Sequence, residues 1–399
     1  MTMLAKTNLF LLCAFATAGA LLLGCGTSDP PRIDGTGGSG AGGAGGAGGA
    51  GGAGGTGGTG GTGGSTPGWV LPACESVSGT SAVTFTHDEG ATLANTPGEL
   101  QGIGYTYGLA ALDTPNTLLA EHKGKVLRSE DAGCTWKEVG TVAGSNYRIT
   151  AAKGGLAYAW AENGPGFYRI DETGPHAFST PAPNIIGLGV DAADGKHLRI
   201  GDASGSLHES HDGGETWSKQ GTPPATGSVI GYRFAFDPAN LDHVLWGQSV
   251  GGSSVTFDGG ATWFESEGLG ANGANAFSLV VSPVDGDVVW AEALEIGPDI
   301  RHIYRSTDGG KTFAVVVTDS PDVQLINGTL LVPHATDAAV LYFVFGMEYQ
   351  DYGTDLFRYD HATGKVEKTH NSYDEVSAIV ASPADPKLLY LGLTVENGG

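Results

Sequence analysis

The sequence predicts an all-β protein, a β-propeller in which four-stranded blades form a closed ring. Beyond residue 68 the chain consists of short runs rich in Val, Ile, Tyr, Phe and Trp, separated by Gly, Pro, Asp and Asn. Such punctuation is typical of strands joined by turns. An eight-residue pattern that reads as strand, tight turn, strand recurs along these runs, and a second type of turn alternates with it. Repeats of about 40 to 50 residues with four strands each indicate propeller blades.

The eight-residue pattern, or octad, has the order Ser or Thr, any residue, Asp, any residue, Gly, any residue, Thr and an aromatic residue. An Asp that enters a turn accepts hydrogen bonds from backbone N–H groups a few residues on. The Gly adopts positive φ without a Cβ penalty, and the aromatic side chain packs the hairpin onto its neighbour. None of these roles requires a substrate, so we expect the octads to be structural. Their Asp residues are Asp131, Asp212, Asp258 and Asp308, and their closing aromatic residues are Trp136, Trp217, Trp263 and Phe313.

The octads resemble the Asp-box, or bacterial neuraminidase repeat, and this resemblance implies a propeller of the sialidase-like or sortilin-like kind. Between Asp131 and Asp212 the interval is 81 residues, whereas the next two intervals are 46 and 50 residues. The long interval therefore predicts a degenerate copy halfway, at Asp171. A further degenerate copy is predicted at Asp360.

The second turn signal combines Pro, Asp, Asn or Gly between two strand-like runs. Its copies lie at residues 112–116, 190–195, 236–240, 281–286 and 381–386. Six blades carry an octad or its remnant, and the runs 376–380 and 388–394 begin a seventh. We expect the N-terminal run 81–86 to help complete this blade, because closing the ring removes exposed sheet edges. Six or eight blades are the alternatives.

The N-terminal segment predicts export. Residues 1–24 combine a positive Lys6 with an apolar run, as in a secretory signal. The end of this run, Leu22-Leu23-Gly24-Cys25, resembles the bacterial lipobox, and the resemblance implies that Cys25 is lipidated. Gly26 after it implies the outer membrane or cell surface. The competing interpretation is an uncleaved membrane helix, which needs about 18 apolar residues or more.

Composition divides the remaining chain. Residues 25–68 contain Cys25 and a tether of Gly-Gly-Ala and Gly-Gly-Thr units, which cannot bury enough apolar surface to fold. Residues 69–399 form the predicted propeller. Cys74 and Cys134 are the cysteines left in this exported part, which favours one disulfide. Two free thiols are the alternative.

The formal net charge of −23 argues against nucleic-acid binding, which needs a basic surface. It also limits membrane contact to the lipid. We find no cofactor motif, and we predict no metal site, because the three-residue spacing of His208 and His211 places them on opposite faces of a strand. We expect a monomer.

The resemblance to Asp-box propellers implies that ligands bind on the side opposite the octads, at loops that join the second and third strands. The candidate binding residues in these loops are Phe345, Glu348, Tyr349, Asp351, Tyr352, Glu292, Glu295, Arg301 and His302. Shorter loops contribute Glu121 and Glu162. Aromatic residues beside carboxylates suit recognition of a sugar or a peptide.

We therefore predict a non-catalytic binding module for an extracellular protein or glycan. One alternative is an exo-acting glycoside hydrolase of the sialidase-like kind. Sialidases place their first Arg in a Phe/Tyr-Arg-Ile-Pro motif, and the nearest match, Tyr147-Arg148-Ile149-Thr150, lacks the Pro and follows the first octad. Its role is therefore not carried over, and the catalytic residues are unknown. A second alternative is a protease-interacting propeller that resembles the dispase autolysis-inducing proteins of bacteria in size.

Overall fold

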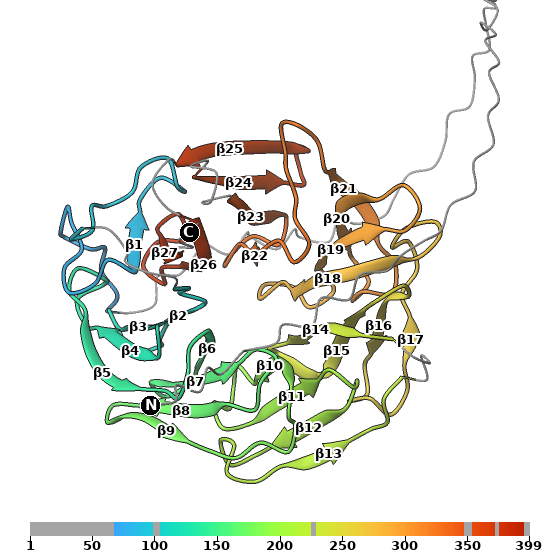
Figure 1. Ribbon diagram of the computed structural model, residues 1–399, viewed down its shortest axis with the longest axis horizontal. Helices are drawn as coiled ribbons and strands as arrows, with labels where there is room; N and C mark the ends of the chain where they lie inside the picture. The colour runs from blue at the N-terminus through green and yellow to red at the C-terminus, as the bar shows by residue number, and fades with distance from the viewer. Residues whose placement is uncertain (1–67, 99–103, 225–228, 347–352, 372–374, 395–399) are drawn as a thin grey trace, which may run out of the picture. The chain divides into compact units, whose positions relative to one another are not determined.

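The computed structural model describes residues 68–98, 104–224, 229–346, 353–371 and 375–394. In these residues the chain forms seven antiparallel sheets, which are arranged as blades in a ring (Figure 1). The prediction of a seven-bladed all-β propeller is confirmed. The signal segment, the tether and Cys25 lie outside the described residues. Among the described residues, no helix is long and apolar enough to cross a membrane.

Blades 1 to 6 each contain four strands in chain order, from the centre of the ring outwards (Figure 1). Blades 1 to 3 are β2 (Gly108–Ala111), β3 (Leu118–His122), β4 (Lys125–Ser129) and β5 (Lys137–Thr141); β6 (Tyr147–Ala152), β7 (Leu156–Ala161), β8 (Phe167–Asp171) and β9 (Gly174–Ala177); β10 (Ile185–Val190), β11 (Leu198–Asp202), β12 (Leu207–Ser210) and β13 (Ser218–Gln220). Blades 4 to 6 are β14 (Gly231–Asp237), β15 (Asn240–Gln248), β16 (Gly252–Thr256) and β17 (Phe264–Glu265); β18 (Ala274–Val281), β19 (Val289–Glu295), β20 (Ile300–Ser306) and β21 (Ala314–Thr318); β22 (Leu331–Pro333), β23 (Val340–Gly346), β24 (Thr354–Asp360) and β25 (Lys365–Asn371).

Blade 7 combines strands from both ends of the propeller sequence, as predicted. Its inner strands are β26 (Glu375–Ala381) and β27 (Leu389–Thr394), and its next strand is β1 (Val83–Thr86). β1 pairs antiparallel with β27, with Val83 opposite Gly392, and Figure 1 shows the blue strand beside the red one. The ring is therefore closed by pairing between the first and last strands.

The two kinds of turn occupy the predicted places. The Pro- and Asp-containing turns join the first and second strands of their blades, and each octad joins the third and fourth. The degenerate copies also join third and fourth strands: Asp171 accepts a hydrogen bond from the Thr173 N–H at 2.8 Å, and Asp360 accepts one from the Thr363 N–H at 3.1 Å.

Each octad is a closed hydrogen-bonded unit. In blade 5, Asp308 accepts bonds from Ser306 Oγ at 2.7 Å, from the Thr312 N–H at 2.9 Å and from Thr312 Oγ1 at 2.7 Å. The Ser306 hydroxyl in turn accepts the Gly310 N–H at 2.9 Å. In blade 3, the bonds from Thr216 lower the pKa of Asp212 to about 2, which keeps the carboxylate ionised and inside the turn.

A fifth octad of the same geometry lies in blade 7 and was missed in the sequence. Asp88 accepts bonds from Thr86 Oγ1 at 2.7 Å, from the Thr92 N–H at 2.8 Å and from Thr92 Oγ1 at 2.8 Å. Its order, Thr86-x-Asp88-x-Gly90-x-Thr92, follows the pattern up to its last position, where Leu93 replaces the aromatic residue.

The octads also join neighbouring blades. The Gly at the fifth position of an octad has positive φ, and a Cβ there would crowd a side chain of the preceding blade. Gly310 has a φ of +90° and would meet Leu245 of blade 4. In blade 1, Gly133 has a φ of +97° and a Cβ there would meet Tyr390 of blade 7. The Tyr390 hydroxyl also donates to the Ala132 carbonyl at 2.7 Å. Octad packing therefore holds the ring together from blade to blade.

A disulfide joins Cys74 to Cys134, with a Cα–Cα distance of 5.8 Å. It attaches the segment before β1 to the octad of blade 1, as the sequence predicts. Backbone hydrogen bonds reinforce this attachment, because the Ser78 N–H donates to the Cys134 carbonyl at 2.8 Å and the Trp136 N–H donates to the Ser78 carbonyl at 3.0 Å.

Candidate functional site

Strand alternation divides the connections of the propeller between two faces. In an antiparallel blade, the connections from strand one to two and from three to four lie at one end, and the other connections lie at the opposite end. The octads define the first end, which we call the box face. The opposite end is the loop face, and the central channel opens there into a cavity of about 490 Å³.

Innermost strands and the segments that precede them line this cavity. Its charged residues are Arg148 of β6, Arg233 of β14 and Glu375 of β26. Its aromatic residues include Tyr105 and Tyr107, which come directly before β2. Each of these residues lies near the beginning of its blade, and this position places it at the loop-face end of the channel.

Two arginines share one carboxylate at this cavity. Glu162, which follows β7, accepts Arg148 Nε at 2.6 Å on one oxygen and contacts Arg233 Nη2 at 2.7 Å through the other. Burial alone would raise the pKa of Glu162, but Arg233 and Arg148 hold it below its ordinary value. Burial and the nearby Arg148 lower the pKa of Arg233 to about 10, against the effect of Glu162. Glu162 is therefore ionised and Arg233 protonated at neutral pH, and two guanidinium groups meet one carboxylate at this place.

An aromatic pair borders the arginines. The rings of Tyr105 and Tyr107 stack with their centroids 5.1 Å apart, and the Arg148 guanidinium lies 5.4 Å from the centre of the Tyr107 ring. Burial raises the pKa of Tyr107, so its hydroxyl remains a neutral donor. Guanidinium groups beside flat aromatic rings suit a ligand with a carboxylate next to an apolar group, such as a peptide.

A buried carboxyl group supports another part of the cavity wall. Glu292 of β19 is fully buried and accepts the N–H of Gly328, a cavity-lining residue, at 2.9 Å. Burial raises the pKa of Glu292 to about 8, against the Gly328 hydrogen bond and Arg301. Within the described part of the chain, Glu292 Oε1 has no hydrogen-bond partner. Glu292 is thus mostly a neutral acid at pH 7.

Glu121 is the counterpart of Glu292 in blade 1. Each is the fourth residue of the second strand in its blade. Glu121 accepts the Gly124 N–H at 2.6 Å and the Tyr147 N–H at 2.9 Å, and burial raises its pKa to about 7. Both carboxyl groups therefore join the second strand of one blade to the start of the next blade.

The structure corrects the predicted loop in blade 5. The loop joining β19 to β20 is restricted to residues 296–299, because the two strands continue to pair up to Glu295 and Ile300. Glu292 and Glu295 are therefore strand residues, as are Arg301 and His302, and the prediction that they form a loop is wrong. Arg301 donates from Nε to Asn327 at 2.8 Å.

The predicted aromatic loop of blade 6 is only partly described. Phe345 is not a loop residue, because it lies in β23 and is 4% exposed. Its place in the blade core follows from the alternation of inward side chains along a strand. Glu348, Tyr349, Asp351 and Tyr352 lie outside the described residues.

The residues that the sequence analysis did not bring together are Arg233, Tyr105 and Tyr107. Arg148 and Glu162 were noted only separately. A repeat alignment could have joined the arginines, because Tyr147-Arg148-Ile149 and Tyr232-Arg233-Phe234 occupy the same position in blades 2 and 4. The tyrosines carry no comparable repeat signal.

Among the described residues, seven blades are present, and five of them carry an octad at the end of their third strand. These features define the class of protein: this chain is an Asp-box β-propeller. The BNR/Asp-box repeat family matches residues 208–219, the octad hairpin of blade 3. The dispase autolysis-inducing protein of Streptomyces mobaraensis is 48% identical over 339 residues, which cover 82% of this chain and 91% of that protein. The chain belongs to the family of the dispase autolysis-inducing protein.

More distant similarities concern the fold. A xyloglucanase of Paenibacillus sp is 28% identical over 264 residues, which cover 62% of this chain but 22% of the enzyme. The solved structure of YCF48 bound to D1 peptide has a TM-score of 0.53 at 13% identity and covers 81% of this chain and 100% of that one. These similarities agree with a propeller, and the xyloglucanase contains much sequence with no counterpart here.

Proposed function

We propose that this protein is an exported, non-catalytic propeller that binds a secreted protease through the cavity on the loop face. The observation that carries the proposal is the 48% identity to the dispase autolysis-inducing protein over 91% of its length, since that relative is named for an effect on a protease. A rigid ring with a charged and aromatic cavity supports binding of a protein segment.

The chemistry of the cavity favours binding over glycoside hydrolysis. A sialidase-like site would combine three arginines with a tyrosine and a carboxylate, whereas two arginines meet at Glu162 here. Both oxygens of Glu162 are occupied by these arginines, and its lowered pKa makes it a poor proton donor. The arrangement instead suits a partner carboxylate, such as an acidic side chain or a peptide C-terminus.

The proposal includes export with lipidation at Cys25, so that the propeller meets its partner outside the cell as a monomer. The Gly-rich tether would hold it away from the membrane surface. A glycan is the alternative binding partner that the sequence predicts, and the stacked tyrosines suit a sugar ring as well as a peptide.

A direct test measures binding of the full chain to a dispase-type neutral protease by surface plasmon resonance, and autolysis by the appearance of protease fragments. Arg148→Gln removes a charge at the loop face, and Lys153→Gln removes one in the β6–β7 turn at the box face of the same blade. Loss of a charge-assisted hydrogen bond of about 1.5–3 kcal/mol weakens binding by roughly 10- to 150-fold.

We expect Arg148→Gln to weaken binding by at least about tenfold and Lys153→Gln to leave it unchanged. Equal affinities of both variants and the wild type would move the interface away from this cavity. Absence of both binding and autolysis would refute the protease partner, and a glycan array would then test the remaining alternative.

A further inference from the structure

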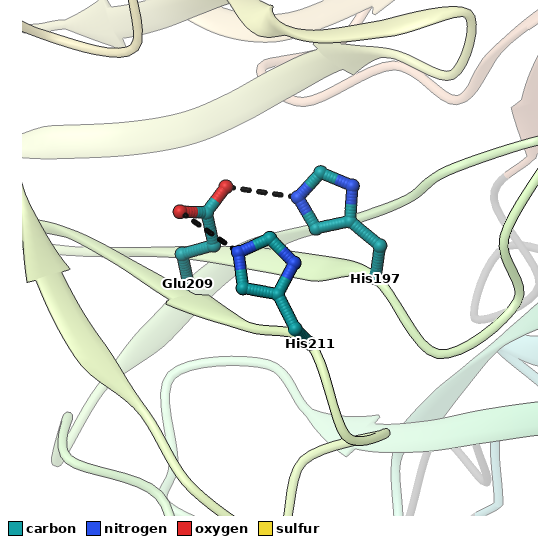
Figure 2. Close-up of side chains that lie close together, drawn as sticks. All are labelled: His197, Glu209 and His211. Carbon is teal, nitrogen blue, oxygen red and sulfur yellow. Dashed lines mark hydrogen bonds and ion pairs between the residues drawn. The ribbon is translucent and has the colours of Figure 1, made fainter.

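A second group of chemically versatile side chains lies on the box face of blade 3, away from the cavity. It consists of His197, which directly precedes β11, Glu209 of β12, and His211 in the octad hairpin. Figure 2 shows that both imidazole rings direct a nitrogen at the same carboxylate. One candidate ligand atom from each residue lies within 4.8 Å of the other two.

The two histidines contact Glu209 at different distances. His197 Nε2 lies 2.8 Å from Glu209 Oε1, and His211 Nε2 lies 3.5 Å from Glu209 Oε2. The two rings stack with centroids 4.4 Å apart and an interplanar angle of 20°. Their parallel orientation lets both Nε2 atoms point toward the same side, where the carboxylate lies.

We propose that His197, Glu209 and His211 form a binding site for a divalent transition metal of the Zn²⁺ class. Two imidazoles and one carboxylate are a ligand set that Zn²⁺ uses in proteins. Ligands about 2.0–2.2 Å from a tetrahedral zinc are about 3.3–3.6 Å apart. His197 Nε2 and His211 Nε2 contact different oxygens of Glu209, at 2.8 and 3.5 Å, and the three ligand atoms lie within 4.8 Å of one another. Binding of the ion therefore requires these side chains to adjust until all three ligand atoms reach the zinc separations.

An outer residue orients one of the ligands. Asp191 Oδ2 lies 3.1 Å from His197 Nδ1, and a carboxylate on the far nitrogen of a metal-binding His fixes its orientation and strengthens it as a ligand. Asp191 is itself held by its turn, because its Oδ1 accepts the Ala193 N–H at 2.7 Å and the Asp194 N–H at 3.1 Å. His197 therefore presents Nε2 from a fixed position.

The charges around the group have a defined arrangement. Arg199 Nη2 lies 2.7 Å from Glu209 Oε1 and 3.0 Å from Asp242 Oδ1. Its charge is thus shared with Asp242, and Glu209 Oε2 remains directed at His211. The metal replaces the proton that joins His197 Nε2 to Glu209. The His211 side chain is 69% exposed, so the group is open to solvent on that side.

The alternative for these residues is an ion-pair network that binds no metal, and a metal titration separates the two. The full chain without a histidine tag is stripped with a chelator and titrated with ZnCl₂ by calorimetry. CoCl₂ serves as the spectroscopic probe, because tetrahedral Co²⁺ absorbs strongly in the visible range. The variants are His211→Asn and Glu209→Gln, and the matched control is His208→Asn on the same strand.

His208 is a suitable control because it contacts Asp202 at 3.6 Å and is not one of the three ligands. We expect one Zn²⁺ per chain, a loss of at least about tenfold in affinity for His211→Asn and Glu209→Gln, and no change for His208→Asn. Asp191→Asn should weaken binding by about 10- to 100-fold.

Absence of saturable Zn²⁺ and Co²⁺ binding to the wild type would overturn the proposal. Unchanged affinity in both His211→Asn and Glu209→Gln would overturn it as well. The exposure of His211 means that its substitution leaves the hairpin folded, and circular dichroism of that variant verifies this. Protease binding is measured separately, so the two proposals fail independently.

Discussion

The buried carboxyl group of Glu292 makes the stability of the propeller depend on pH. Its pKa is about 8 in the folded protein against 4.5 for an unperturbed Glu. Below pH 4.5 both the folded and the unfolded states hold the proton. Between about pH 4.5 and 8 the unfolded state releases it and the folded state keeps it, so the free energy of unfolding falls as the pH rises.

The size of this effect follows from the pKa difference. For one proton held only by the folded state, the free energy of unfolding falls by about 1.4 kcal/mol per pH unit. The pKa shift of Glu292 therefore lowers the free energy of unfolding by roughly 4–5 kcal/mol once the pH exceeds 8. Glu121, with a pKa of about 7, acts in the same direction over a narrower range. These two carboxyl groups therefore lower the free energy of unfolding as the pH rises from 5 to 7. His122, whose burial lowers its pKa to about 4, opposes them below its ordinary pKa of 6.5, so the contribution of Glu292 is read from the difference between the wild type and a variant.

Glu292→Gln isolates the contribution of Glu292. Gln retains an oxygen for the Gly328 N–H but cannot ionise. The free energy of unfolding should therefore fall less steeply with pH than in the wild type, by about 1.4 kcal/mol per pH unit. The measurement is urea denaturation of the disulfide-bonded chain at intervals from pH 5 to 9. Glu265→Gln, on the exposed strand β17, is the matched control and should retain the wild-type slope.

A buried amide without a partner for its N–H group lowers the stability of Glu292→Gln by a constant of about 1–3 kcal/mol. The slope is therefore the informative quantity, and the absolute stability is not. A wild-type slope in Glu292→Gln would mean that Glu292 is already ionised at neutral pH, and the argument from burial would be refuted.

Three further predictions concern the octads, the disulfide and the lipid. Asp308→Ala and Asp88→Ala should each lower the free energy of unfolding by about 2–3 kcal/mol, since each Asp accepts three hydrogen bonds; a loss of partner binding at full stability would contradict the structural role. Replacing Cys74 and Cys134 by Ser opens a loop with a sequence separation of 60 and should lower the free energy of unfolding, measured by denaturation, by about 4 kcal/mol. Equal stability of the wild type under reducing and oxidising conditions would contradict a stabilising disulfide. Cys25→Ser should move the protein from the membrane fraction to the soluble fraction, as measured by immunoblotting after fractionation. An unchanged distribution would contradict lipidation at Cys25.

The propeller could be predicted from the sequence because its information is local and repeated. An octad determines its own turn through hydrogen bonds within eight residues, so each copy is visible without tertiary contacts. The copy at Asp88 was missed for two reasons. Leu93 replaces the aromatic residue, and the run before it, residues 81–86, was expected only to add a strand to the last blade. Ring closure was nevertheless predictable, since the alternation of residues 81–86 required a partner strand.

The cavity was less predictable because its residues come together only through the ring. Arg148 and Arg233 lie in blades 2 and 4, and nothing local indicates that Glu162 contacts both. Glu292 was misplaced for a different reason: a carboxylate in an apolar strand resembles the start of a loop, and only burial shows it to be a neutral acid. His197 precedes β11 and Glu209 lies in β12, so they meet only because these two strands pair. A search for spaced His pairs along one strand could not find them.

The pairing of β1 with β27 has a consequence for a protein that meets a protease. In an open chain of blades, one cut between two blades separates the fragments. In this ring, a single cut between two blades leaves both fragments joined at blade 7, where four residues of β1 pair with β27. Octad contacts would still hold the cut edges together. We therefore expect the nicked protein to persist as a two-fragment complex under native conditions and to separate only on denaturing gels.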